Sequence, residues 1–197
     1  MGFIGNIIGI LTFNKSKIRT IANEDGTTSQ AVLIAFLASI IGSLPGLLDY
    51  LATDDPTQQE IAIYGALVAF CTVLLIFFLF SGIMAFILRG FGGTATLIQC
   101  LRVFGFAQVW SLIGGIIDLA LSYFNVDLGL GLALSFILGF VGLIVFIIGL
   151  TAFSGLGIGA ALIATIIAYI LAVIAFYIIL ATILTMLVIA LFGATFS

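Results

Sequence analysis

Long apolar blocks alternate with short polar or glycine-rich gaps along this chain of 197 residues. A helix that crosses the hydrocarbon layer of a bilayer, about 30 Å thick, needs about 17–25 apolar residues. Each block reaches that length. The blocks cover residues 31–48, 61–88, 103–124, 128–150 and 160–192. This pattern predicts an all-α integral membrane protein with a bundle of five transmembrane helices.

The boundary between the last two blocks rests on small residues, because no charged residue follows position 127. Residues 151–159 have the sequence TAFSGLGIG, which is small, polar and rich in glycine, as is typical of a turn. This turn divides the region into two spans. A further break would give six spans, and that alternative stays open at this point.

The first 30 residues precede the apolar blocks and form an N-terminal lead-in, which leaves residues 31–197 as the membrane domain. Apolar side chains at helical spacing over residues 3–13 predict a short helix at the membrane interface. We expect the bases that follow to hold this helix to an anionic leaflet, each contributing about 1 kcal/mol. The apolar positions are Phe3, Ile4, Ile7, Ile8 and Leu11, and the bases are Lys15, Lys17 and Arg19.

Composition supports the membrane assignment. Hydrophobic residues make up 64% of the chain and charged residues 7%, whereas soluble domains carry about 25% charged residues. So few charges cannot cover the surface of a water-soluble domain. The net charge of −3 also argues against nucleic acid as a partner, because nucleic acid requires a basic patch.

The distribution of charge predicts an orientation. All the bases lie in the lead-in or between the second and third blocks, whereas the gap between the first and second blocks holds four acids and no base. Short loops rich in Lys and Arg remain in the cytoplasm. We therefore expect a cytoplasmic N-terminus and an external C-terminus in a prokaryotic plasma membrane. The bases are Lys15, Lys17, Arg19, Arg89 and Arg102, and the acids are Asp49, Asp54, Asp55 and Glu60.

Residues 91–114, FGGTATLIQCLRVFGFAQVWSLIG, resemble the signature region of the Ypt-interacting protein (Yip) family of small polytopic membrane proteins. The lead-in from Gly9 (GILTF) through residues 21–31 (IANEDGTTSQA) resembles that of the bacterial and archaeal branch. Family members usually have Pro where this chain has Trp110, so a helix break at this point stays open. The matching signature positions are Gly92, Gly93, Thr96, Leu101, Arg102, Gly105, Phe106, Ala107 and Gln108.

The resemblance implies a fold of five membrane helices with a cytoplasmic N-terminus, and it implies no biochemical activity. Eukaryotic relatives are tied to Rab-type GTPases and vesicle traffic, and they carry long cytoplasmic N-terminal regions. The lead-in of this chain ends near residue 30. A Rab-type GTPase is therefore not expected as a partner.

A polar stripe crosses the third block. Its members recur at steps of three and four residues, which places them on one helix face, and such a face should turn toward the bundle or toward water. Intramembrane acids often mark ion or proton paths, which makes Asp118 a candidate for transport. The alternative is an acid that is hydrated near the outer surface or bonded to a neighbouring helix. The stripe consists of Gln108, Ser111, Gly115, Asp118 and Ser122.

A second polar cluster lies where we expect the inner membrane surface. It is a candidate contact for lipid phosphates or an acidic partner; alternatively it anchors the third helix, with one arginine paired to Glu24 or Asp25. The glycine pair at 92–93 should let the chain turn before Thr94 or Thr96 caps the next helix. The candidate contact residues are Lys15, Lys17, Arg19, Arg89, Gln99 and Arg102.

Small residues at steps of four predict faces where helices pack closely. One such ridge lies in the last block and a second near the end of the first block. We interpret both as packing faces within the chain, with contact between two copies as the alternative. The ridges consist of Ala160, Ala164, Ala168 and Ala172, and of Gly42 and Gly46.

Residues suited to catalysis are scarce. The chain has no His, the side chain most often used for acid–base chemistry and for metals such as zinc, and it has no pair of intramembrane acids. Cys71 and Cys100 lie at different depths and should not form a bridge. Both should be structural, with lipidation of Cys100 as the alternative. We predict no enzymatic activity, no metal and no cofactor.

Three functions fit these features. The first is a membrane organiser or adaptor that acts through helix packing and its inner face, in contact with membrane lipids and other membrane proteins. The second is an accessory subunit of a larger membrane complex. The third is a small transporter or channel that uses the stripe around Asp118.

Overall fold

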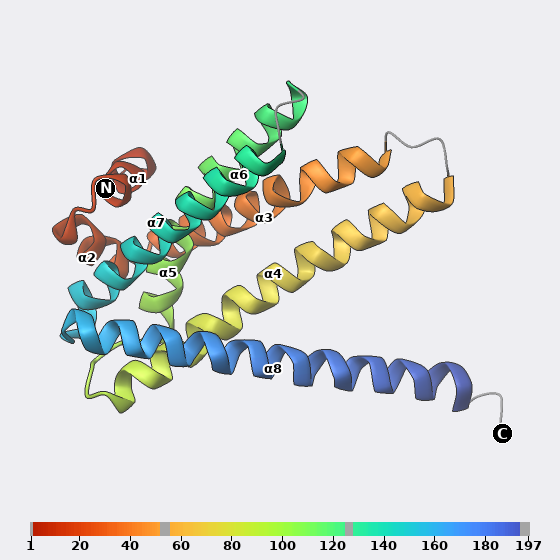
Figure 1. The fold of residues 1–197 in the computed structure, drawn as a ribbon. Coiled ribbons are helices and arrows are strands. Elements are labelled where there is room, and N and C mark those ends of the chain that lie inside the picture. Colours follow the sequence, from red (N-terminus) through yellow and green to blue (C-terminus); the bar gives the residue numbers. More distant parts are fainter. Residues whose placement is uncertain (1, 52–55, 125–127, 194–197) are drawn as a thin grey trace.

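The computed structural model describes residues 2–51, 56–124 and 128–193, which form eight α-helices and no strand (Figure 1). The helices are α1 (Phe3–Leu11), α2 (Lys15–Asn23), α3 (Thr27–Leu51), α4 (Pro56–Gly90), α5 (Leu97–Ala107), α6 (Val109–Tyr123), α7 (Leu128–Ser154) and α8 (Ile158–Gly193).

Five segments of the described chain are long and apolar enough to cross a membrane, which confirms the predicted all-α fold and its number of spans. The first begins earlier than predicted, because α3 starts within the expected lead-in. The segments are Thr27–Leu44, Ile63–Gly90, Leu97–Tyr123, Ala133–Ser154 and Ile158–Ile183.

The turn between α7 and α8 is shorter than the predicted turn over residues 151–159. Helix α7 continues to Ser154, and α8 begins at Ile158. The hydroxyl groups of Thr151 and Ser154 donate to carbonyl oxygens of their own helix, at 2.7 and 2.6 Å, so these polar residues fit within α7. The chain then reverses at Gly155, whose φ of +76° is a conformation that glycine adopts readily.

The third span consists of two helices. It begins at Leu97, before the predicted start at residue 103. Helix α5 ends at Ala107 and α6 begins at Val109, with Gln108 (φ −64°, ψ −9°) between them. The span contains no proline, so the chain breaks here although Trp110 stands where family members usually have Pro.

The lead-in forms two helices, α1 and α2, and we call this pair the N-terminal platform. Ile10 of α1 and Ile18 and Ile21 of α2 are completely buried against the bundle. Ile4 and Ile8 of the predicted interfacial face remain 72% and 53% exposed. Apolar packing therefore helps to fix this segment to the bundle, and electrostatic attraction to the membrane stays a prediction.

The reversal between α1 and α2 has a clear local cause. Phe13 has a φ of +55°, and the side chain of Asn14 caps α2 by accepting a hydrogen bond from the backbone N–H of Lys17 (3.1 Å). The two helices then approach closely, since a Cβ at Gly9 would lie 2.6 Å from the Cβ of Lys17. Asparagine is a favoured N-cap, but the sequence analysis did not identify it.

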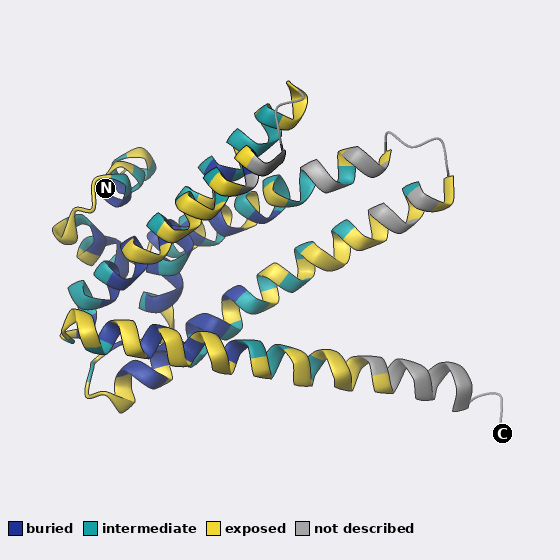
Figure 2. Ribbon diagram, viewed as in Figure 1, coloured by how far each residue is buried: buried dark blue, intermediate teal, exposed yellow. Residues whose placement is uncertain are grey.

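Aromatic rings cluster where α4, α5 and α7 meet. The ring of Phe104 lies 5.4 Å from Phe77, 4.7 Å from Phe80 and 5.1 Å from Phe146, distances typical of favourable aromatic pairs. Helix α3 packs against α4, α5 and α6, α6 packs against α7, and α8 packs against α4 and α7. Figure 2 shows buried residues concentrated toward the end that carries the N-terminal platform. Figure 1 shows α4 and α8 diverging away from that end.

Candidate functional site

The guanidinium group of Arg102 ties α5 to the residues around the end of α2. Arg102 is buried, and its Nε donates to Oγ1 of Thr28 at 2.7 Å. Its Nη1 donates to the carbonyl oxygen of Ala22 (3.0 Å), and its Nη2 donates to Oδ1 of Asp25 (2.8 Å). Asp25 is one of the two acids named as partners in the anchor interpretation. This geometry supports an anchor, because all three guanidinium nitrogens already donate within the chain.

Two pairs of amide side chains extend this network. Nε2 of Gln99 on α5 donates to Oδ1 of Asn23 at the end of α2 (2.8 Å). Nδ2 of Asn6 on α1 donates to Oε1 of Gln30 on α3 (3.1 Å). Each pair joins one platform helix to one helix of the membrane bundle, so the platform is held by polar as well as apolar contacts.

A glycine pair and a capping box shape the turn between α4 and α5. Gly92 has a φ of +86°, and a Cβ on Gly93 would lie 2.9 Å from a carbonyl oxygen of α4. Oγ1 of Thr96 accepts from the backbone N–H of Gln99 (3.2 Å), and Oε1 of Gln99 accepts from the N–H of Thr96 (2.9 Å). Of the two threonines predicted to cap this helix, Thr96 is the cap.

The other bases differ from Arg102 in exposure and in partners. Nε of Arg89 donates to the carbonyl oxygen of Ala95 at 2.7 Å, within the same turn. Lys15 and Arg19 are exposed on α2, and Lys17 is half-buried. The structure therefore does not gather the six predicted contact residues into one site. It places Arg102 and Gln99 in the platform network and leaves Lys15 and Arg19 on the surface.

The five positions of the predicted stripe do not share one cavity. Gly115 faces α3, where an added Cβ would lie 3.0 Å from a side-chain carbon of Ile41. The carboxylate of Asp118 faces α7 and fills the space that a side chain at Gly131 would need. Ser122 is exposed. The remaining two positions, Gln108 and Ser111, line cavities within the bundle.

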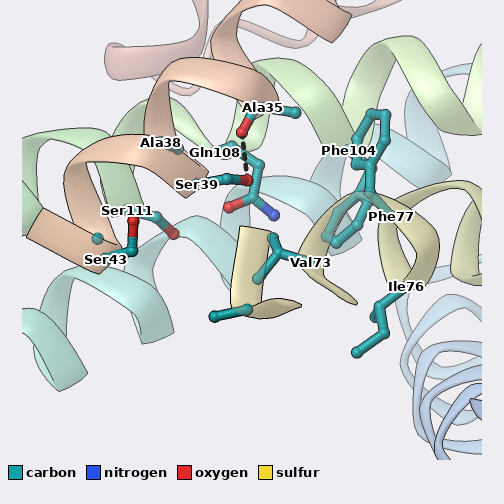
Figure 3. Close-up of a pocket in the computed structure, with 12 residues that line it drawn as sticks. Ala35, Ala38, Ser39, Ser43, Val73, Ile76, Phe77, Phe104, Gln108 and Ser111 are labelled. Atoms are coloured by element: carbon teal, nitrogen blue, oxygen red, sulfur yellow. Dashed lines mark hydrogen bonds between the residues drawn. The ribbon is translucent and has the colours of Figure 1, made fainter. Parts of the chain in front are cut away.

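Two neighbouring cavities share Gln108 and Ser111 as lining residues. The first, here the α3 cavity, has a volume of about 380 Å³ and lies between α3, α4 and the α5–α6 break. The second, here the α8 cavity, has a volume of about 690 Å³ and lies among α4, α5, α7 and α8. Figure 3 shows Gln108 and Ser111 near Ser39 and Ser43 of α3 in the first cavity. Both cavities are lined by Ile76, Phe104, Gln108 and Ser111.

The alanine ridge of α8 lies in the core. Ala164, Ala168 and Ala172 are buried together with Ala161, whereas Ala160 is half-buried. On α3, the backbone N of Gly42 would lie 3.5 Å from a Cβ at Gly115 of α6, so the two helices approach closely at this glycine. A methyl group at Gly42 would meet no atom within 4 Å, and Gly42 lines the α3 cavity. The surroundings of Gly46 lie outside the described residues.

Groups suited to catalysis or metal binding do not come together in the described residues. No three His, Cys, Asp or Glu side chains lie close enough there to hold a metal ion. Both cysteines are free thiols, and Cys100 is completely buried. Lipidation of Cys100 would require access to its sulfur, so the structure contradicts that alternative and supports a packing role.

The signature residues and the spans point to one family. The family model of the Yip1 domain matches residues 8–183. The chain belongs to the Yip1 domain family. This Yip1-domain protein is therefore a multi-pass integral membrane protein, and the Yip1 family is not known as enzymatic. No curated protein and no solved structure matches the chain.

The signature residues of this Yip1 domain mainly shape the fold. A Cβ at Gly105 would lie 2.6 Å from the carbonyl oxygen of Ala31, so this glycine allows α5 to cross close to α3. Gln108 forms the helix break. Ser39 and Ser43 line the same cavity as Gln108 and lie outside the predicted polar stripe. The spacing of four residues between Ser39 and Ser43, which places both on one helix face, is the sequence signal that could have identified them.

Proposed function

We propose that this Yip1-domain protein is a non-enzymatic membrane organiser or adaptor that presents the N-terminal platform at the cytoplasmic surface of a prokaryotic plasma membrane. The observation that carries the proposal is the Arg102 network. Its bonds to Ala22, Asp25 and Thr28 fix α2 to the membrane bundle. The platform is thereby a preformed surface, and binding to it requires little ordering of the chain.

The exposed residues of the platform suit a membrane surface and an adjoining protein. Ile4 and Ile8 present an apolar strip on α1, and Lys15 and Arg19 present positive charge on α2. Apolar and basic groups together favour contact with an anionic leaflet. An accessory subunit of a larger complex would use the same surface, with the difference that its partner would be needed for stability.

The packing around Asp118 favours this role over transport. Its carboxylate fits against Gly131 of α7, and Gly115 fits against Ile41 of α3. Neither position lines the cavities at Gln108 and Ser111. Contacts of this kind support a packing role for the middle of the stripe.

Copurification from the native membrane tests the proposal. We expect the tagged protein, extracted in a mild detergent, to retain specific membrane proteins. Ile4→Ser/Ile8→Ser and Lys15→Glu/Arg19→Glu should each lose these proteins while the variants stay folded, because all four side chains project outward. The matched control is Ile63→Ser, at an exposed site on α4. Retention of the same proteins by both platform variants would reject the platform as the contact.

A further inference from the structure

The α8 cavity lies at the middle of the membrane spans, where residues near the centre of four spans line it. The α3 cavity shares Gln108 at this depth and extends to Ser43, near the end of the first span. At this depth a polar group without a hydrogen-bond partner costs several kcal/mol. Polar groups in these cavities therefore need a partner. The central lining residues are Ile76 of α4, Gln108 at the α5–α6 break, Leu143 of α7 and Tyr169 of α8.

The α3 cavity has both donors and acceptors to offer. The hydroxyls of Ser39 and Ser43 donate to carbonyl oxygens of α3 at 2.7 and 2.8 Å, which leaves their oxygen lone pairs as acceptors. The side chains of Gln108 and Ser111 have no hydrogen-bond partner among the described residues, although both line the cavity (Figure 3). A group bound here can accept from the Gln108 amide and donate to a neighbouring oxygen.

The α8 cavity is larger and mostly apolar, with Thr165, Tyr169 and Tyr177 as its polar residues besides Gln108 and Ser111. Its walls include Phe80 and Phe146 on the inner side, and Leu143, Ile166 and Ile170 where α7 and α8 face the membrane. The last three side chains are exposed, so the cavity opens toward lipid. An extended hydrocarbon chain could enter from the bilayer and reach Gln108 without crossing a polar surface.

We propose that the α8 cavity binds a long-chain alcohol, with the hydroxyl at Gln108 and Ser111, beside the α3 cavity, and the hydrocarbon chain in the α8 cavity. A hydroxyl both accepts and donates, which matches the unpaired amide and the serine oxygens. No charged side chain is among the described residues that line either cavity. A phosphate or carboxylate headgroup would remain uncompensated at this depth, where a charge is costly.

Photolabelling tests this assignment. The protein in lipid nanodiscs is irradiated with a hexadecanol that carries a diazirine on its chain, and the labelled peptides are identified by mass spectrometry. We expect labelling of α7 and α8 around Leu143 and Ile170. Excess hexadecanol should suppress it, whereas hexadecane, which lacks the hydroxyl, and palmitate, which is charged, should not. Gln108→Leu should weaken competition by hexadecanol roughly tenfold, the effect of about 1.4 kcal/mol of hydrogen bonding.

A second variant separates loss of the site from loss of the fold. Gly139 lines the α8 cavity, and a Cβ at this position would meet no atom within 4 Å, so we expect Gly139→Leu to block labelling and leave thermal stability unchanged. Gly65→Leu, at an open position of α4 outside both cavities, is the matched control and should label normally. Equal competition by hexadecane, or full labelling of a folded Gly139→Leu, would overturn the proposal.

Discussion

The Arg102 guanidinium is buried, yet its ion-pair partner Asp25 is fully exposed at a distance of 2.8 Å between Nη2 and Oδ1. The positive charge of Arg102 is therefore shielded from water by the bundle, and the negative charge of Asp25 compensates it at the protein surface. The carbonyl of Ala22 and the hydroxyl of Thr28 complete its hydrogen bonds. Arg102 thus connects the inside of the bundle to the edge of the N-terminal platform.

Replacing Arg102 should destabilise the protein more than replacing Arg89. Arg102→Ala removes three hydrogen bonds from a buried network, and we expect a loss of about 2–4 kcal/mol. Arg89→Ala removes one bond, from an exposed residue. Thermal unfolding in detergent measures both. Equal midpoints for the two variants would show that the Arg102 network does not stabilise the fold.

Because α5 crosses close to α3, replacement of glycine by alanine should have opposite effects on stability at Gly105 and at Gly65. Gly105→Ala places a Cβ 2.6 Å from the backbone of Ala31 and should cost about 1–3 kcal/mol or more through overpacking. Gly65→Ala, where a Cβ meets nothing within 4 Å, should be neutral or stabilise α4 by up to about 1 kcal/mol. Unfolding midpoints check the contrast. A Gly105→Ala protein as stable as the parent would contradict the close approach.

The platform should remain in place after its bases are neutralised. Lys15→Gln/Lys17→Gln/Arg19→Gln leaves the buried Ile18 and Ile21 untouched, so we expect the N-terminus to resist limited proteolysis as in the parent. Ile18→Asn should expose it, because an amide in that apolar site lacks partners. Rapid cleavage of the N-terminus in the neutralised variant would show that electrostatic attraction holds the platform in place.

The contact between Asp118 and Gly131 predicts a compensating pair. Gly131→Ala should destabilise the protein, because its methyl group would take the space of the Asp118 carboxylate. Asp118→Ala in the same chain removes that carboxylate, and the double variant should recover most of the lost stability. A double-mutant cycle of unfolding free energies measures the coupling. Additive losses would show that the two residues do not meet.

The two ends of α4 should lie on opposite sides of the membrane. In a Cys71→Ser/Cys100→Ala background, Thr57→Cys should react with an impermeant maleimide in intact cells, whereas Thr94→Cys should react only after permeabilisation. Both threonines are exposed, so local burial does not limit either reaction. The reverse pattern would invert the orientation derived from the bases.

The sequence predicts the spans well and the side-chain sites less well. Within the hydrocarbon layer, a segment that is not part of a closed β-barrel can pair its backbone N–H and C=O groups only as a helix. Each long apolar block therefore predicts one transmembrane helix. The sequence pattern does not predict α2, because this helix is largely polar and its buried face consists of Ile18, Ile21 and Ala22. The sequence could not decide whether Glu24 or Asp25 pairs with Arg102, because the two acids are adjacent and only the fold determines which carboxylate reaches the guanidinium group. The spacing of the polar stripe assumes one continuous helix through Gln108. The helix break at Gln108 changes the direction in which the stripe residues on either side of it point.

The lengths of α4 and α8 make this protein responsive to bilayer thickness. The apolar part of α4, Ile63–Gly90, has 28 residues, which corresponds to about 42 Å of helix. The hydrocarbon layer is about 30 Å thick, and such a mismatch is relieved by tilting or by local thickening. Tilt of α4 and α8 in different directions would widen the divergence seen between them (Figure 1). We expect membrane thickness to set the angle between these two helices, and with it the preference of the protein for thicker regions of a membrane.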